Sequence, residues 1–230
     1  MRRIHLLAAL VVLATTAAPA FSQEAIDLFN GKNLDGWKFK GNDPAKGKLK
    51  VGKTSLDKAD PTKFAIDESA TGELINYARG VDFYTDAKFG DVKLEIEFTV
   101  PKGSNSGIYV MGEYEVQILD SYGRKQIGQG DLGALYGAAV PKENAALAPG
   151  EWQKFVIEFQ APRFDKDGKK IANAKFLKVT LNGKVIHENV EMKGPTPGGL
   201  TGKEAPTGPL MIQGDHGPVA FRLIRATPLK

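Results

Sequence analysis

The 230-residue sequence contains no cysteine, which excludes disulfide bonds, thiolate metal sites, iron–sulfur clusters and cysteine nucleophiles. It has only three histidines, so a metal site built from several imidazoles is not expected. An excess of one charge is also missing, because 31 Lys and Arg are balanced by 27 interspersed Asp and Glu. A nucleic-acid-binding surface needs clustered basic side chains. The sequence therefore predicts neither a nucleic-acid partner nor thiol chemistry.

Sustained apolar runs are missing except at the N-terminus. Arg2 and Arg3 precede an apolar run over residues 6–14, which is too short to span a bilayer and is followed by small residues. This pattern predicts a secretory signal peptide over residues 1–20, with cleavage after Ser22 or an uncleaved anchor as alternatives. Loss of the two arginines leaves 29 basic and 27 acidic residues, a net charge of +2. We expect a periplasmic or secreted protein with no membrane contact after cleavage.

Residues 24–230 show the pattern of one all-β domain. Residues 93–99 alternate strictly between apolar and polar side chains, as in a half-buried strand. Asn182-Gly183 lies between two apolar-alternating runs and predicts a hairpin. Further strands are expected at residues 107–110, 114–119, 154–159, 176–181, 184–187, 210–213 and 219–225. Many short strands with Gly and Pro between them, and no helical period, favour an antiparallel jelly-roll β-sandwich.

Two segments are less regular. Residues 42–63 are rich in Lys, Gly, Asp and Pro and are expected to form a surface excursion. Residues 194–208 contain too much Gly and Pro for a strand and predict a long loop. Long loops inside a compact domain are often functional, so this one is either a rim of a binding site or a simple connection.

Seven motifs follow one another along the chain. They are residues 27–37 (DLFNGKNLDGW), 105–110 (NSGIYV), 114–121 (YEVQILDS), 133–137 (GALYG), 149–152 (PGEW), 181–183 (LNG) and 208–213 (GPLMIQ), the last followed by His216-Gly217 and Phe221-Arg222. Together they resemble the 3-keto-disaccharide hydrolase family, whose members are also described as 3-keto-glucoside 1,2-lyases and 3-keto-2-hydroxyglucal hydratases. The resemblance implies a concanavalin-like jelly roll and an extracytoplasmic sugar-active protein.

The chain departs from the family pattern at two places. Met111 stands where the family often has arginine, and residues 219–223 read Val-Ala-Phe-Arg-Leu where the family often has Val-Glu-Phe-Arg-Asn. Both changes remove polar groups that could contact a substrate. They therefore bear on the identity of the substrate more than on the fold.

Glu115 and Gln117 are the first candidate site residues. In an extended strand over 114–119 they lie on the face opposite Tyr114, Val116 and Ile118. With the apolar trio in the core, the carboxylate and the amide project onto the other face, which in a central jelly-roll strand can form a concave sugar-binding surface. The alternative is an ordinary solvated strand face.

An ordinary glycosidase pair of carboxylates is not expected in this segment. Glu115 and Asp120 are five steps apart, about 16 Å along a strand, and point to opposite faces. Retaining and inverting glycosidases need their carboxyl groups about 5 Å or about 6.5–9.5 Å apart. Asp120 is instead expected to accept hydrogen bonds from backbone N–H groups of the following turn.

His216 is the second candidate for proton transfer. It lies in a glycine-flanked turn, and imidazole titrates near neutral pH. Gln213, Arg222 and Tyr136 are candidate substrate-binding residues, with Tyr136 suited to stacking on a sugar ring. Two of these residues have a structural alternative, which is a hydrogen-bonded turn histidine for His216 and a structural ion pair for Arg222.

The family resemblance implies cleavage of a 3-keto-glycoside by proton removal next to the keto group, β-elimination and hydration. This chemistry needs one base, one acid and a group that stabilises the enolate oxygen. The sequence leaves open whether Glu115 or His216 is the base. No nicotinamide-binding fingerprint is visible, whereas a divalent metal held by Glu115, His216 and nearby carboxylates stays open. The alternative function is a non-catalytic carbohydrate-binding module of the same fold.

Overall fold

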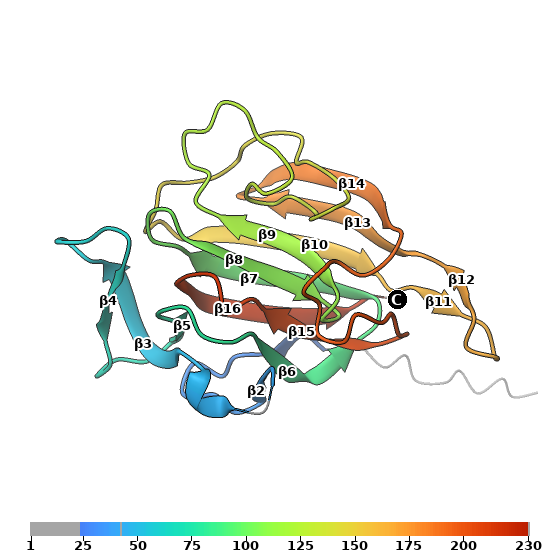
Figure 1. The fold of residues 1–230 in the computed structure, drawn as a ribbon, viewed down its shortest axis with the longest axis horizontal. Helices are drawn as coiled ribbons and strands as arrows, with labels where there is room; N and C mark the ends of the chain where they lie inside the picture. Colours follow the sequence, from blue (N-terminus) through green and yellow to red (C-terminus); the bar gives the residue numbers. More distant parts are fainter. Residues whose placement is uncertain (1–23, 42, 230) are drawn as a thin grey trace, which may run out of the picture.

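In the computed structural model, which describes residues 24–41 and 43–229, the chain forms two antiparallel sheets packed face to face (Figure 1). The predicted all-β fold is confirmed, and the arrangement is that of a jelly-roll sandwich. The signal peptide predicted over residues 1–20 and both cleavage sites lie outside the described residues. Within the described part of the chain, no helix has the length and apolar character needed to cross a membrane.

The larger sheet has nine strands in the order β14-β13-β10-β7-β16-β5-β3-β4, and β1 pairs with β16 outside this path. Its strands are β1 (Ile26–Asp27), β3 (Leu49–Leu56), β4 (Phe64–Asp67), β5 (Glu73–Asn76), β7 (Val92–Thr99), β10 (Gln153–Gln160), β13 (Ala174–Leu181), β14 (Lys184–Met192) and β16 (Val219–Pro228). The C-terminal strand thus lies in the middle of this sheet, between β7 and β5.

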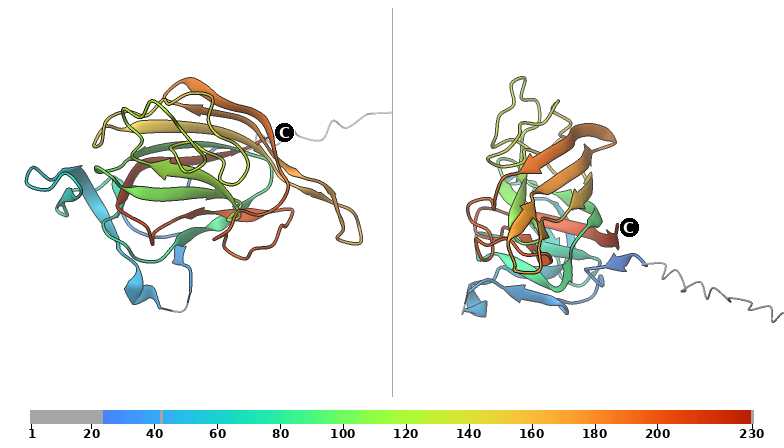
Figure 2. Two further views of the ribbon diagram at one scale, coloured as in Figure 1. Left: turned by 45° about the horizontal axis from the view of Figure 1, so that its top comes forward. Right: turned by 90° about the vertical axis from the view of Figure 1, so that its right-hand side faces the viewer.

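The smaller sheet has five strands in the order β2-β6-β15-β8-β9. These are β2 (Trp37–Phe39), β6 (Phe83–Phe89), β15 (Gly208–Ile212), β8 (Asn105–Val110) and β9 (Tyr114–Leu119). Outside both sheets lie the hairpin of β11 (Arg163–Phe164) and β12 (Lys170–Ala172) and a short 3₁₀ helix, Pro44–Lys46. The view along the layers in Figure 2 shows the two sheets and the long loops that cover the outer side of the smaller one.

The core lies between the two sheets and follows from strand alternation. Every second residue of β7 and β10 is buried and the residues between them are partly exposed, except that Thr99 at the end of β7 is also buried. Phe98 and Phe155 stack with their ring centroids 5.1 Å apart, and Tyr114 of the smaller sheet meets Phe159 of the larger one at 5.3 Å. Burial of each such side chain contributes roughly 1.5–3 kcal/mol, so this double layer of large side chains holds the sheets together.

The predicted hairpin at Asn182-Gly183 is confirmed as the β13–β14 turn. Both residues have positive φ angles, 52° and 81°, as a two-residue turn matched to the strand twist requires. Two expectations were wrong. The segment 42–63 is only partly an excursion, because it contains β3, which pairs with β5 in the larger sheet. Strand β9 is the outermost strand of the smaller sheet rather than a central one.

Candidate active site

The outer face of the smaller sheet carries a cavity of about 370 Å³. It is lined by Lys40, Asp82, Asn105, Tyr109, Glu115, Gln117, Tyr136, Pro197, Gly198, Gln213, Asp215 and His216. The predicted alternation of β9 places Tyr114, Val116 and Ile118 in the core and leaves Glu115 and Gln117 to line this cavity. Five of the six site residues predicted from the sequence therefore lie around one space.

Glu115 lies deep in this cavity, with only 3% of its surface exposed. The phenolic hydroxyl of Tyr109, its direct neighbour across β8 and β9, donates a hydrogen bond of 2.9 Å to Glu115 Oε2. Gly107 makes room for the other carboxylate oxygen: a Cβ on this glycine would lie 2.3 Å from Oε1. Any other residue at position 107 would therefore displace the carboxylate.

Burial raises the pKa of Glu115 from its ordinary value of 4.5 to about 7, because a charge is poorly solvated there. The Tyr109 hydrogen bond and the charge of His216 act in the opposite direction and favour the ionised form. The nearby carboxylates of Asp82 and Asp215 raise the pKa further. A carboxyl group of this kind exchanges a proton at neutral pH, as a general base or acid must.

The loop over residues 194–208 forms one wall of the cavity, so it is a rim of the site and not a simple connection. Thr196 N–H donates to Glu113 O at 2.7 Å, and Thr196 Oγ1 accepts from the backbone N–H of Glu115 at 3.1 Å. The buried carboxylate of Glu113 accepts three hydrogen bonds from this loop: from the N–H of Thr201 (2.8 Å), its hydroxyl (2.7 Å) and the N–H of Gly202 (3.0 Å). The loop is thereby fixed to the hairpin that carries Glu115.

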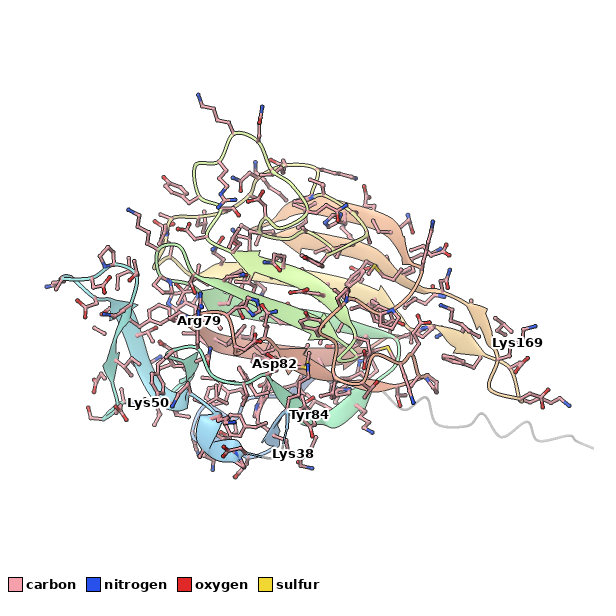
Figure 3. All side chains as sticks on the ribbon, viewed as in Figure 1. Lys38, Lys50, Arg79, Asp82, Tyr84 and Lys169 are labelled. Atoms are coloured by element: carbon pink, nitrogen blue, oxygen red, sulfur yellow. The ribbon has the colours of Figure 1, made fainter. Side chains whose placement is uncertain are left out.

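An ion pair between Lys40 and Asp82 also holds the loop over residues 194–208 beside the cavity. Lys40 Nζ contacts Asp82 Oδ2 at 3.1 Å and the carbonyl oxygens of Gly198 and Gly199 at 2.8 and 3.2 Å. An ammonium group has three N–H donors, so all of them are engaged. Asp82 also accepts from Gly214 N–H at 3.0 Å. This pair therefore joins β2, the start of β6 and two loops; Figure 3 shows Asp82 near the centre of the molecule.

Three amide side chains face the cavity. Gln117 Nε2 donates to Asn105 Oδ1 at 2.8 Å, which orients the Asn105 amide so that its Nδ2 remains a donor. Gln213 follows β15 directly, and its Oε1 is a buried oxygen with no hydrogen-bond partner among the described residues. A buried acceptor left unpaired is costly. Asn105, Gln117 and Gln213 thus supply the amide groups of the cavity lining.

His216 lies at the rim of the cavity, in the turn between β15 and β16. Its Nδ1 contacts Asp215 Oδ1, which leaves Nε2 as the ring nitrogen for a ligand. Two side chains hold the backbone of the turn: Asn76 Nδ2 donates to Gly214 O, and Arg79 Nε donates to His216 O. The imidazole is therefore an accessible side chain on a well-anchored turn.

Arg222 is the one predicted site residue that the structure places elsewhere. It lies on the outer face of the larger sheet, where its Nε donates to Glu97 Oε2 at 2.7 Å. The guanidinium carbon Cζ lies over the Trp152 ring, 4.7 Å from the ring centroid. Its side chain points away from buried Phe221, and the face that it joins belongs to the sheet without the cavity. The structural ion pair is thus the correct alternative for Arg222.

Sequence reasoning missed several residues of the cavity. Asn105 and Tyr109 could have been found, because residues 105, 107 and 109 of the NSGIYV motif share one strand face. Asp215 stands beside His216 in the sequence. Lys40 and Asp82 carry no local signal, because they reach the cavity only through sheet pairing with distant segments.

The acidic residues and the histidine of the cavity are the candidate ligands for a divalent metal. Asp82, Glu115, Asp215 and His216 all line the cavity. Among residues 24–41 and 43–229, however, no three or more His, Asp or Glu side chains are arranged to hold an ion. Two of these carboxylates are already engaged, Asp82 with Lys40 and Asp215 with His216.

Comparison with known proteins identifies the family and supports the fold. The profile of the 3-keto-alpha-glucoside-1,2-lyase-like domain matches residues 24–227, and the chain therefore belongs to this family. Its structure is similar to two crystal structures from Parabacteroides distasonis, each described as a "putative glycosyl hydrolase". The first is 30% identical, with 89% of this chain and 84% of that chain covered and a TM-score of 0.64. The second is 18% identical, with 90% and 94% covered and a TM-score of 0.59. A search of curated proteins gives no match.

Proposed function

We propose that the protein is a carbohydrate-active enzyme that cleaves 3-keto-glycosides by β-elimination, followed by hydration. The observation that carries this proposal is Glu115, a buried carboxyl group with a pKa near 7 in an otherwise polar cavity. Family membership supports the same chemistry. A solvated strand face, the alternative considered for Glu115, would not bury the carboxylate to this extent.

Glu115 is assigned as the base. A keto group at C3 makes the hydrogen at C2 acidic, because the resulting carbanion is stabilised as an enolate. Glu115 Oε1 accepts no hydrogen bond from the described residues, so it is the oxygen that takes this proton. A pKa near 7 makes the ionised group a stronger base than an ordinary carboxylate and still leaves about half of it ionised at neutral pH.

His216 is assigned as the acid. With Nδ1 held by Asp215, Nε2 delivers a proton to the oxygen that leaves C1, and a C1–C2 double bond forms. Asn105 and Gln213 line the cavity, and their amide N–H groups are assigned to stabilise the enolate oxygen, with Gln117 orienting the Asn105 amide. Water then adds its hydroxyl to C1 and a proton to C2, which completes a net hydrolysis to the free 3-keto sugar.

The first experiment uses the purified mature protein with methyl 3-keto-glucoside and a 3-keto-disaccharide, and follows release of the 3-keto sugar. Glu115→Gln should lower kcat by about 10²–10⁴, the usual contribution of a general base. Glu143→Gln, a change in an exposed ion pair with Lys184, is the matched control and should retain activity. Sugar binding without turnover by the wild-type protein would instead support a carbohydrate-binding module.

A second substrate separates the two roles. The 4-nitrophenyl 3-keto-glucoside has a leaving group that needs no protonation, so His216→Ala should lose much less activity on it than on the methyl glycoside. Glu115→Gln should lose activity on both substrates alike. Equal losses for His216→Ala on both substrates would reject His216 as the acid. Repeating the assays with EDTA, and with divalent ions restored, tests whether a cation takes part in enolate stabilisation.

We also propose that the chain is exported to the periplasm or secreted, on the pattern of residues 1–20. N-terminal sequencing of the protein recovered from the extracytoplasmic fraction should give a start at Phe21, or at Gln23 for the alternative cleavage. Recovery of an intact Met1 terminus from membranes would support an uncleaved anchor.

A further inference from the structure

The turn over residues 213–218, between β15 and β16, carries two exposed side chains on a closely held backbone. Asp215 Oδ1 contacts His216 Nδ1, and both side chains are exposed. An exposed side chain is not enclosed by packing, so the place of the imidazole depends on the path of the backbone on either side of it. The groups that hold this backbone therefore decide where His216 Nε2 lies.

Asn76, at the end of β5, joins the two sides of the turn. Its Nδ2 donates to Gly214 O at 3.1 Å and to Gly217 O at 2.9 Å, so both hydrogens of the amide are used. These two carbonyl groups stand directly before Asp215 and directly after His216 in the chain. One buried side chain thus fixes the distance that the Asp215-His216 segment must span.

The carbonyl oxygen of the Asn76 side chain has no such role. Asn76 Oδ1 is buried and has no hydrogen-bond partner among residues 24–41 and 43–229. A buried acceptor without a donor is costly. The amide therefore contributes to the turn through its two N–H donors and not through its oxygen.

The ends of the turn and its middle are held by different groups. The hydroxyl groups of Ser106 and Ser104 donate to the first and last carbonyls of residues 213–218, at 2.8 and 2.5 Å. Between these ends, Arg79 Nε donates to His216 O at 2.9 Å. The serines thus fix where the turn begins and ends, while Asn76 and Arg79 fix the part that carries the imidazole.

We propose that Asn76 is a positioning residue for His216 and that Arg79 assists it. The proposal rests on the proposed function, in which His216 Nε2 protonates the oxygen that leaves C1. Asn76 does not belong to the lining of the cavity, so it acts through the backbone of the turn and not on the substrate. Proton transfer needs donor and acceptor in a defined geometry, and a misplacement of about 1 Å can lower the rate by about 10²-fold. Loss of Asn76 therefore slows the one step that depends on His216.

The test is Asn76→Ser, because a serine has one donor and cannot join both carbonyl groups. Activity is measured on methyl 3-keto-glucoside, whose leaving oxygen needs a proton, and on 4-nitrophenyl 3-keto-glucoside, whose leaving group does not. Asn144→Ser is the matched control. Asn144 Nδ2 also donates to two backbone carbonyls, Ser121 O at 2.7 Å and Arg124 O at 3.0 Å, but it holds a turn outside the cavity lining.

We expect Asn76→Ser to lower kcat on the methyl glycoside by about tenfold or more, with KM little changed, and to alter the nitrophenyl glycoside by less than about twofold. Combined with His216→Ala, it should cause no further loss, because Asn76 acts only through His216. Equal losses on both substrates, or a further loss in the double variant, would overturn the positioning role. Asn144→Ser should leave both activities unchanged.

Arg79→Ala serves as a second variant if Asn76→Ser does not fold. Arg79 is exposed, so its loss does not open the core, and a smaller loss with the same preference for the methyl glycoside is expected. Equal effects on both substrates would reject the role here too.

The ring signals of His216 in a proton–nitrogen NMR spectrum separate this proposal from the proposed function. They are assigned by their absence in His216→Ala. They should shift in Asn76→Ser and stay in place in Asn144→Ser, whether or not the wild-type protein cleaves either substrate. Wild-type inactivity would reject the function alone, whereas unchanged His216 signals in Asn76→Ser would reject the positioning role.

Discussion

Glu113 and Glu115 are two buried carboxylates that lie two residues apart on one hairpin, with 4% and 3% of their surfaces exposed. Glu113 accepts three hydrogen bonds from the loop over residues 194–208. Glu115 accepts one, from Tyr109, and its second oxygen faces an open cavity above Gly107. The two carboxylates are buried to nearly the same extent, but Glu113 accepts hydrogen bonds from three donors and Glu115 from one.

This difference separates a structural carboxylate from a reactive one. Hydrogen bonds to an ionised oxygen stabilise the charge, so a carboxylate with several donors holds its surroundings in place. A carboxylate with few donors keeps part of the cost of burial, and it relieves that cost by taking up a proton. We therefore interpret Glu113 as the residue that fixes the wall of the site and Glu115 as the residue that exchanges a proton inside it.

The largest expected effect concerns the stability of Glu115→Gln at different pH values. Glu115 has a folded-state pKa of about 7 against 4.5, so the wild-type protein should lose stability as the pH rises from 4.5 to 7 and stay at the lower level above that. The glutamine variant cannot ionise. It should therefore be more stable than wild type by up to about 3 kcal/mol at pH 8, with the difference vanishing below pH 4.5. Urea unfolding of both proteins across this range measures it.

A constant difference between the two proteins at all pH values would show that Glu115 keeps the same charge in the folded and unfolded chains. That result would contradict the interpretation of Glu115, in contrast to Glu113, as the carboxyl group that exchanges a proton in the folded protein.

The next effect is expected for Glu113→Gln, which places an NH₂ group opposite the N–H or hydroxyl donors of the loop. Leaving such buried groups unsatisfied should lower the free energy of unfolding by about 1–3 kcal/mol. It should also make the loop over residues 194–208 more sensitive to limited proteolysis. Glu73→Gln is the matched control: Glu73 is 4% exposed and accepts from Thr54 N–H and hydroxyl, but it lies in the larger sheet.

The control variant should lose stability without exposing that loop to protease. If Glu113→Gln leaves the loop as resistant as in wild type, the carboxylate does not act as the clamp.

A smaller effect is expected for Tyr109→Phe. The Tyr109 hydroxyl favours the ionised form of Glu115, so its removal should raise the pKa of that carboxyl group further. The acidic limb of the kcat/KM profile should move to higher pH by about 0.5–1 unit, in line with the loss of one charge-assisted hydrogen bond. A pH–rate profile on methyl 3-keto-glucoside measures the shift, and movement toward lower pH would contradict this role.

The smallest effect is expected for the ion pair between partly exposed Glu97 and Arg222, which lies outside the cavity. Arg222→Ala should change stability by less than about 1 kcal/mol, because exposed ion pairs and cation–π contacts contribute little. Its kcat/KM should stay within about twofold of wild type. A tenfold loss of activity would show that Arg222 contributes to the reaction. It would then contradict the interpretation that the buried carboxyl group in the cavity, and not the partly exposed ion pair, carries the function.

Local alternation was enough to predict much of this arrangement. The two-residue period of β9 assigned Glu115 and Gln117 to one face and their apolar neighbours to the core, and the Asn182-Gly183 turn fixed the β13–β14 hairpin. Both features depend on residues close together in the sequence, so no knowledge of the tertiary structure was needed to find them.

Pairing between distant segments was not predictable in the same way. Alternation within one strand directs Arg222 and Phe221 to opposite faces, but it does not say which of the two sheets the strand joins. Lys40 and Asp82 approach each other only because β2 pairs with β6. The segment 42–63 was rich in turn-forming residues, and its strand β3 is held by pairing with β5 and β4 rather than by local preference.

The central place of β16 has a consequence for how the chain folds. This strand follows all other strands of the two sheets in the sequence, yet it pairs with β7, β5 and the first strand, β1. Until it emerges, the larger sheet is divided into two parts, each with an unpaired edge in what will become its middle. Open edges of this kind favour association with other chains, and contacts between distant segments form slowly. The larger sheet therefore becomes continuous only when β16 is available.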